Sequence, residues 1–260
     1  MPGGAVSPNV LLLPTCLVDM FRPVVGFSAV DLLQRAGCQV AVSRNLSCCG
    51  QPAYNSGARS LAVRLAKRVI AESESYDYVV IPSGSCAGMV RRHYAPLFAG
   101  HGEWESRARA LAEKTFELVS FITDVRKVDE IDSKFSHQVT YHDSCSGLRE
   151  LGLWAQPRAL LRSIAALSLI ESAQGEVCCG FGGLFCVKYP EISDRMVSDK
   201  CAAVAATGAK VLLGADLGCL MNIAGKLSRL GSEVEVRHVA EVLAGRLTEP
   251  PLCSDSMAER

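Results

Sequence analysis

Short apolar runs alternate with longer amphipathic segments along most of the chain. The runs are rich in Val, Ile and Leu and are bounded by polar residues or glycine, which is typical of buried β-strands. They are "NVLLL" (9–13), "CQVAVS" (38–43), "YVVIPS" (78–83), "QVTYH" (138–142), "LSLIES" (167–172) and "KVLLG" (210–214). Strands that alternate with helices predict βαβ units, and therefore an α/β fold with parallel sheets.

Helical spacing is clearest in two of the segments between these runs. In 57–73, Leu61 and Leu65 share one face while basic residues lie on another, and 190–208 has the same spacing before a terminal glycine. The segment "HGEWESRARALAEKTFELVSFITDVR" (101–126) predicts a helical pair. The expected architecture is therefore βαβ-rich, with helices between successive strands.

Eight of the twelve cysteines form two copies of one pattern, in which a single cysteine is followed by an adjacent pair with a glycine and then by another single cysteine. The two sets are Cys16, Cys48, Cys49 and Cys86 in the first half, and Cys145, Cys178, Cys179 and Cys219 in the second. Matching cysteines are offset by 129, 130 and 133 residues. The cysteines without a counterpart are interpreted as core or surface thiols: Cys38, Cys186, Cys201 and Cys253.

This repetition predicts two pseudo-symmetric halves. We expect an N-terminal repeat at 1–126, a C-terminal repeat at 138–247 and a polar linker at 127–137 between them. The remaining residues, 248–260, are expected to form a mobile tail.

Each of the eight matched cysteines comes shortly after the carboxyl end of a predicted strand. Ligands bind at that edge of an open α/β sheet, so each half should bring its four thiols to one place. Around a cluster, their sulfurs should lie on the order of 6–8 Å apart. The helices that follow should point their N-termini at the same place, which favours an anionic ligand. Gly50 and Gly180 supply the backbone freedom that such loops need.

Four chemistries are considered for these thiols. Buried core cysteines have no reason to repeat at strand ends. Redox thiols usually occur as Cys-x-x-Cys, and a disulfide between adjacent residues is strained. Zinc suits four thiolates, but its ligands usually come from compact knuckles. An iron–sulfur cluster takes thiolates from distant loops, and four thiolates complete one [4Fe–4S] cluster.

The composition and charge of the chain limit the kinds of binding partner and the cellular compartment that we expect. The 27 Lys and Arg balance the 27 Asp and Glu, so no electrostatic argument favours nucleic acid. The first ten residues lack the pattern of a signal peptide, and no apolar run reaches the roughly 18 residues of a membrane span. We expect a cytoplasmic protein whose thiols stay reduced. No glycine-rich nucleotide fingerprint or flavin motif is found, and no catalytic residues for substrate oxidation are identified.

The repeated cysteine pattern resembles the cysteine-rich CCG domain of the heterodisulfide reductases and of the glycolate oxidase iron–sulfur subunit. The segments around the cysteines are most similar to the lactate utilization protein A family. These segments are "TCLVDMFRPVVG" (15–26), "CCGQPAYNSG" (48–57), "PSGSCAGM" (82–89), "YHDSCSGLRELG" (141–152), "CCGFGGLFCVKYPEIS" (178–193) and "GADLGCLMNI" (214–223).

The resemblance implies an iron–sulfur electron-transfer subunit of a multi-protein complex that oxidises L-lactate to pyruvate. It implies lactate utilization proteins B and C as companion subunits, a small 2-hydroxy acid as the substrate of the whole complex, and one [4Fe–4S] cluster on the four matched cysteines of each half. Zinc in one half, a zinc-stabilised scaffold and a heterodisulfide-type thiol reductase stay open as alternatives.

The sequence departs from the superfamily pattern at one point. That pattern often ends in Cys-x-x-Cys, whereas Met89 and Asn222 occupy the last position here. Four-thiolate clusters therefore fit the sequence better than five-thiolate clusters. His142 and Asp143 lie beside Cys145, where a histidine could relay a proton, tune a cluster by hydrogen bonding, ligate it, or only fix the loop.

Other residues near the cysteines have more than one interpretation. Arg22, Arg149 and Lys188 offset the charge of a reduced cluster, hold a carboxylate, or are ordinary solvated bases. The segment 178–193, with aromatic residues such as Tyr189, either forms a docking face or packs beneath the second cluster.

Overall fold

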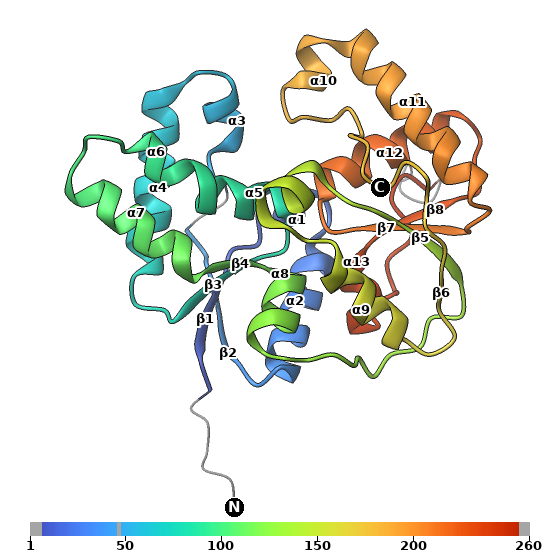
Figure 1. The fold of residues 1–260 in the computed structure, drawn as a ribbon, viewed down its shortest axis with the longest axis horizontal. Coiled ribbons are helices and arrows are strands. Elements are labelled where there is room, and N and C mark those ends of the chain that lie inside the picture. The colour runs from blue at the N-terminus through green and yellow to red at the C-terminus, as the bar shows by residue number, and fades with distance from the viewer. Residues whose placement is uncertain (1–6, 46–47, 255–260) are drawn as a thin grey trace, which may run out of the picture.

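Two four-stranded sheets form the framework of the molecule (Figure 1). The computed structural model describes residues 7–45 and 48–254. The strands are β1 (Asn9–Leu12), β2 (Gln39–Val42), β3 (Tyr78–Ile81), β4 (Thr115–Glu117), β5 (Gln138–His142), β6 (Ser168–Leu169), β7 (Val211–Gly214) and β8 (Glu235–His238). The first sheet has the order β2-β1-β3-β4 and the second β6-β5-β7-β8, and these strands pair in parallel. The predicted α/β fold with two parallel sheets is confirmed.

The two sheets are built in the same register. In the first sheet Val10 of β1 pairs with Tyr78 of β3, and in the second Val139 of β5 pairs with Val211 of β7. These partners are shifted by 129 residues (10 to 139) and by 133 residues (78 to 211). The same two shifts relate the first and the last cysteines of the two sets. The repeat in the sequence is therefore a repeat of the backbone.

Helices connect the strands and cover both faces of each sheet (Figure 1). The α-helices are α1 (Cys16–Phe21), α2 (Pro23–Arg35), α3 (Gln51–Asn55), α4 (Arg59–Ser73), α5 (Gly84–Gly88), α6 (Tyr94–Leu97), α7 (Glu103–Lys114), α8 (Leu118–Ser120), α9 (Ala155–Ser163), α10 (Phe185–Lys188), α11 (Pro190–Ala206), α12 (Leu217–Arg229) and α13 (Val239–Ala244). The part of the chain that the structure describes also contains the π-helical turns η1 (Met89–His93), η2 (Phe121–Val125) and η3 (Ser146–Glu150). In the described residues, no helix combines the length and the apolar character that a membrane span requires.

The pattern of apolar runs predicts six of the strands but neither β4 nor β8. Both are short edge strands, and "TFE" and "EVRH" contain charged residues in place of an apolar run. The helical pair expected at 101–126 is wrong at its centre, because α7 ends at Lys114 and the backbone becomes extended at Thr115. The long helices expected at 57–73 and 190–208 are confirmed as α4 and α11.

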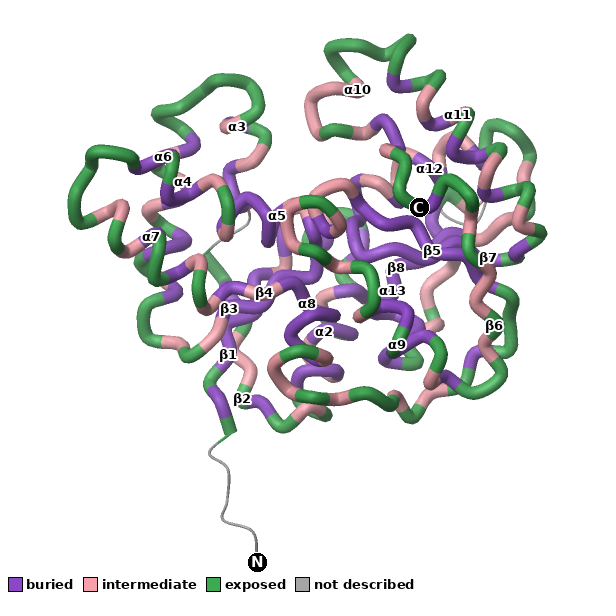
Figure 2. Tube along the Cα trace, in the orientation of Figure 1, coloured by how far each residue is buried: buried purple, intermediate pink, exposed green. Residues whose placement is uncertain are grey.

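One continuous apolar core joins the two halves. Alternate residues of a strand face opposite sides of its sheet. Val10 and Leu12 belong to a core that also contains Val139 of the second sheet, whereas Leu11 and Leu13 belong to an outer core of the first half. Helices α2, α8, α9 and α13 lie between the sheets, and Figure 2 shows this layer as largely buried. The relative position of the two halves is thus fixed by shared packing.

The proposed linker at 127–137 falls between η2 and β5. In the proposed tail, Leu252 is buried and its N–H donates to the carbonyl of Val236 at 3.0 Å. The first six residues of the chain and the last six of the tail lie outside the described residues. The division into two repeats, linker and mobile tail stays a prediction.

A buried ion pair bridges the halves inside this shared core. Arg22 precedes α2, and its Nη2 and Nε atoms donate to Oε2 and Oε1 of Glu241 in α13 at 2.7 and 3.2 Å. Both side chains are buried, at 3% and 0% exposure. Such a two-point contact fixes orientation as well as distance. Of the sequence interpretations of Arg22, holding a carboxylate describes this contact, and the carboxylate is that of the buried Glu241. The solvated interpretation is wrong, because Arg22 is buried.

We predict that Arg22→Ala destabilises the protein by about 3 kcal/mol, because the buried Glu241 carboxylate loses both hydrogen bonds from Arg22 and keeps only Arg237, 3.9 Å away, as a counter-charge among the described residues. The matched control is Arg195→Ala, which breaks an exposed pair with Asp199 and should cost at most about 1 kcal/mol. Denaturant unfolding of both variants in the same metal state measures the difference. Equal losses would contradict a structural role for the buried pair.

Candidate metal centres

The cysteines of each set follow three strands of one sheet, as the sequence predicts. In the first half, Cys16 is the first residue of α1 after β1, the adjacent pair lies between β2 and α3, and Cys86 lies in α5 after β3. In the second half, Cys145 precedes η3 after β5 and Cys219 lies in the first turn of α12 after β7. The single cysteines therefore lie at helix starts, and only the pairs lie in loops.

The four thiols of the first half are in contact with one another. The Cys49 thiol donates to Cys86 Sγ at 3.3 Å, and the backbone N–H of Gly50 donates to Cys48 Sγ at 3.3 Å. A hydrogen bond from the Cys16 thiol is the main contact that lowers the pKa of Cys48 well below the ordinary thiol value. The sulfurs of Cys49 and Cys86 thus converge within the expected cluster width of 6–8 Å, and at 3.3 Å they must move apart to surround a cluster.

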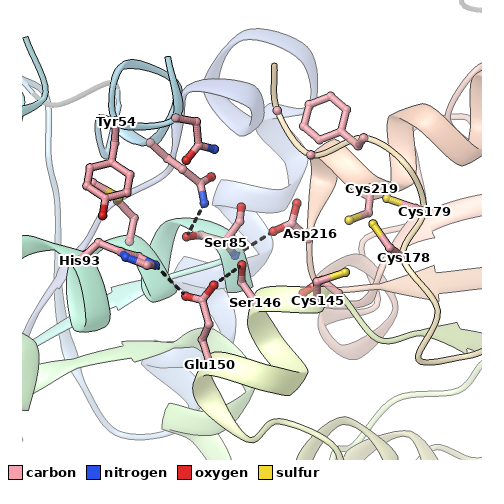
Figure 3. A pocket seen from close by; sticks show the side chains of 17 residues that line it. Tyr54, Ser85, His93, Cys145, Ser146, Glu150, Cys178, Cys179, Asp216 and Cys219 are labelled. Carbon is pink, nitrogen blue, oxygen red and sulfur yellow. Dashed lines mark hydrogen bonds and ion pairs between the residues drawn. The ribbon is translucent and has the colours of Figure 1, made fainter. Parts of the chain in front are cut away.

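The second half repeats this arrangement (Figure 3). The backbone N–H of Gly180 donates to Cys178 Sγ at 3.4 Å. Hydrogen bonds from Cys145 and Cys179 lower the pKa of Cys178, as their counterparts do for Cys48. A ring nitrogen of His142 and the sulfurs of Cys179 and Cys219 all lie within 4.8 Å of one another.

Glycine explains how adjacent cysteines can face one site. Gly50 and Gly180 have φ angles of +85° and +83°, in the left-handed region that other residues rarely adopt. This turn aims the glycine N–H back at the first sulfur of the pair. At Gly180 space is limiting as well, since a Cβ atom would lie 2.8 Å from the carbonyl oxygen of Ser193.

The second cysteine of each pair is anchored through its carbonyl group, by different residues in the two halves. The buried Tyr94 hydroxyl donates to the carbonyl of Cys49 at 2.7 Å. The Asn222 Nδ2 donates to the carbonyl of Cys179 at 2.9 Å. In both halves, therefore, a side-chain hydrogen bond holds the carbonyl group of the second cysteine of the pair.

Buried charges brace the second site. The Lys200 ammonium is 1% exposed and donates to the carbonyls of Gln174 and Gly175 in the loop before the cysteine pair. Burial lowers the pKa of Lys200, and nearby thiolates oppose that shift. Asp143 accepts two hydrogen bonds from the buried guanidinium of Arg158, at 2.8 and 2.9 Å. The Asp143 side chain thus fixes the loop around Cys145.

A cavity of about 330 Å³ opens between the halves, against the second set of cysteines (Figure 3). Its wall includes His93 and Glu150, paired at 3.3 Å, and Asp216. Asp216 accepts hydrogen bonds from the Ser85 backbone N–H and the Ser83 hydroxyl, at 2.9 and 3.1 Å. Residues of both halves therefore line one polar space beside the second site.

The donor set of each site suits a thiophilic metal centre. Each half offers four free thiols, and in each half the pKa of one of them, Cys48 or Cys178, is lowered by its neighbours. Cysteine thiolates are the usual ligands of iron–sulfur clusters and of structural zinc. The second site adds one imidazole to the four sulfurs.

Comparison with known proteins gives the family. A model of the cysteine-rich domain called CCG matches residues 10–91 and 139–224, so it covers both sets of cysteines. Lactate utilization protein A of Shouchella clausii is 48% identical over 90% of this chain and 98% of its own length. The proteins of that name from Geobacillus sp. and Bacillus subtilis are each 46% identical over 92% of this chain and 100% of their own length.

This chain belongs to the lactate utilization protein A family. The family resemblance predicted from the motifs is therefore confirmed. Among solved structures, a hypothetical protein from Helicobacter pylori has a TM-score of 0.62 at 12% identity. That match covers 95% of this chain and 52% of the other, and at this identity it shows the shared fold alone.

The two positions where this family member lacks the superfamily's last cysteine have different roles. Met89 is fully buried in the outer core of the first half. Asn222 instead anchors the carbonyl of Cys179.

Sequence reasoning did not identify several groups that shape the sites. Tyr94, Lys200 and Asp216 lie far from the motif cysteines of the loops they contact, so no local spacing signals them. Arg149 and Lys188 are exposed, which agrees with their interpretation as ordinary solvated basic residues.

We predict that Gly180→Ala reduces metal bound by the second set of cysteines, because the added Cβ strains φ and meets the carbonyl of Ser193. Gly208→Ala is the matched control, since Gly208 has a φ of +68° but open space around it. Metal content per chain and thiol titration compare the two. A similar loss in both variants would mean that backbone strain alone, and not the fit of this loop, causes the effect.

Proposed function

We propose that the protein is a two-cluster electron-transfer subunit of a cytoplasmic multi-protein complex that oxidises L-lactate to pyruvate. The observation that carries the proposal is the pair of equivalent four-thiol sites, one at the carboxyl edge of each sheet. The names of the relatives support a role in lactate utilization. The eight matched cysteines would hold one [4Fe–4S] cluster in each half.

Partial exposure of the sites supports electron transfer. Several of the thiols are only half-buried, among them Cys16 in the first half and Cys145 in the second. A bound cluster would accept or release one electron at a time, whereas a hydroxy acid gives up two. Two clusters in one chain therefore suit a protein that takes electrons from one partner and passes them to another.

Two other functions are kept as outcomes of the test. A zinc-stabilised scaffold would use the same thiolates without redox chemistry. A thiol reductase would use the close pair Cys49 and Cys86, whose sulfurs are 3.3 Å apart, in disulfide exchange.

We predict that the full-length chain, purified and reconstituted without oxygen, contains about eight iron and eight acid-labile sulfide per chain, as two [4Fe–4S] clusters require. Cys86→Ser and Cys219→Ser should each remove about half of the iron. Cys253→Ser is the control, because this exposed thiol belongs to neither set and should leave the iron unchanged.

Zinc without sulfide would support the scaffold. Reduction of a disulfide substrate by metal-free protein would support the reductase. Either result would overturn the electron-transfer proposal.

We further propose that companion subunits, lactate utilization proteins B and C, dock beside the second site. Val187, Tyr189 and Ile192 are 72%, 54% and 55% exposed, close in sequence to Cys178 and Cys179. Exposed apolar and aromatic residues of this kind anchor protein interfaces.

We predict that the double variant Lys188→Ala and Tyr189→Ala weakens assembly with the companion subunits about tenfold, equivalent to about 1.4 kcal/mol, because an aromatic anchor is lost. Its visible and EPR cluster spectra should be unchanged. Leu230→Ala, at an exposed position beyond the end of α12, is the control. Binding is measured by titration of the purified subunits. If cluster content falls together with binding, these residues are structural and the docking face lies elsewhere.

A further inference from the structure

Equivalent positions beside the two sets of cysteines differ in polarity. The residue three positions before the first cysteine is Leu13 in the first half and His142 in the second. Leu13 directly follows β1, His142 ends β5, and β1 and β5 are equivalent strands of the two sheets. Leu13 packs in the same apolar core as Cys49 and Cys86. The second half has therefore replaced an aliphatic side chain by an imidazole.

In the described part of the chain, the His142 ring has no hydrogen-bond partner. The side chain is 2% exposed, and both Nδ1 and Nε2 are buried without a donor or acceptor in range. Leaving such a group unpaired costs about 1–3 kcal/mol. One ring nitrogen lies within 4.8 Å of the sulfurs of Cys179 and Cys219. The ring is thus directed at the second metal centre.

A second replacement of the same kind lies nearby. In these two helices the offset is 131: a Cβ on Gly50 would meet Ala62 and Leu65 of α4, and a Cβ on Gly180 would meet Ser193 and Met196 of α11. This offset relates Val69 in α4 to Lys200 in α11. Val69 is buried in the outer apolar core, whereas the Lys200 ammonium interacts electrostatically with Cys145, Cys178 and Cys179. Burial and the positive charge of Lys200 lower the pKa of His142. An imidazole carries at least one N–H donor in either protonation state.

We infer that His142 donates a hydrogen bond to a sulfur of the second centre, and that this contact makes the second centre the one with the higher reduction potential. The inference rests on the proposed iron–sulfur function. Reduction adds negative charge to a cluster, so an N–H donor and a nearby cation stabilise the reduced form more than the oxidised form. Leu13 and Val69 offer neither at the first centre. Electrons held by the chain would therefore collect at the second centre, beside the cavity.

The test is a redox titration of the reconstituted full-length chain, followed by EPR. Wild type should show two midpoint potentials, and Cys219→Ser identifies which one belongs to the second centre. His142→Leu should lower the second potential and leave the first unchanged. His142→Gln keeps an N–H donor and should recover part of the shift. The reciprocal change Leu13→His should raise the potential of the first centre.

The outcomes separate this inference from the function on which it rests. Wild type without iron and sulfide would remove the proposed function itself. Clusters that are intact in His142→Leu and Leu13→His, with potentials unchanged, would overturn the role of His142 alone. If His142→Leu loses the second centre, Leu13→His decides: a higher first potential supports the inference, and an unchanged one overturns it.

Discussion

Four thiols in mutual contact are the constraint on which the rest of the structure depends. Removing sulfur from water disfavours the thiolate, and neighbouring thiolates repel one another. In each site the pKa of the first cysteine of the pair, Cys48 or Cys178, is lowered, because a neighbouring thiol and a glycine N–H stabilise its thiolate. Binding a metal centre must release the remaining protons and move the sulfurs apart, so metal affinity is coupled to pH. The left-handed glycine turns and the two anchored carbonyl groups hold the backbone while the side chains rearrange.

The sites are rigid because the sheets behind them share one core. The strand ends that carry the cysteines belong to two parallel sheets in the same register, and helices from both halves fill the space between them. The buried pair of Arg22 and Glu241 crosses that space. A protein with two independent repeats would let its sites drift relative to each other. Here the packing that stabilises each half also sets the separation between the sites.

Much of the fold and the position of both cysteine sites could be predicted, because the sequence repeats the same pattern of apolar runs and cysteines in its two halves. Six strands appear as apolar runs, and the doubled cysteine pattern marks both sites and the equivalence of the halves. Strands β4 and β8 could not be predicted, since edge strands of three or four residues with charged side chains leave no apolar run. The roles of Tyr94 and Lys200 could not be predicted either, because each donates a hydrogen bond to a loop that is distant in sequence. His142 was noticed beside Cys145, but only the structure shows that its ring is buried, unpaired among the described residues and directed at two sulfurs.

The contact between the halves also shortens the path between the sites. Helix α5 and the turn η3 meet at glycines, where a Cβ on Gly84 would lie 3.0 Å from Gly147. The Ser83 hydroxyl caps α5 by accepting from the N–H of Cys86. Across the contact it donates to Asp216, which is three residues before Cys219. A short chain of hydrogen bonds and backbone therefore runs from the last cysteine of the first set to the last cysteine of the second. Since a larger residue at Gly84 would force the two elements apart, the same glycine contact that joins the halves also brings the two centres into one connected unit.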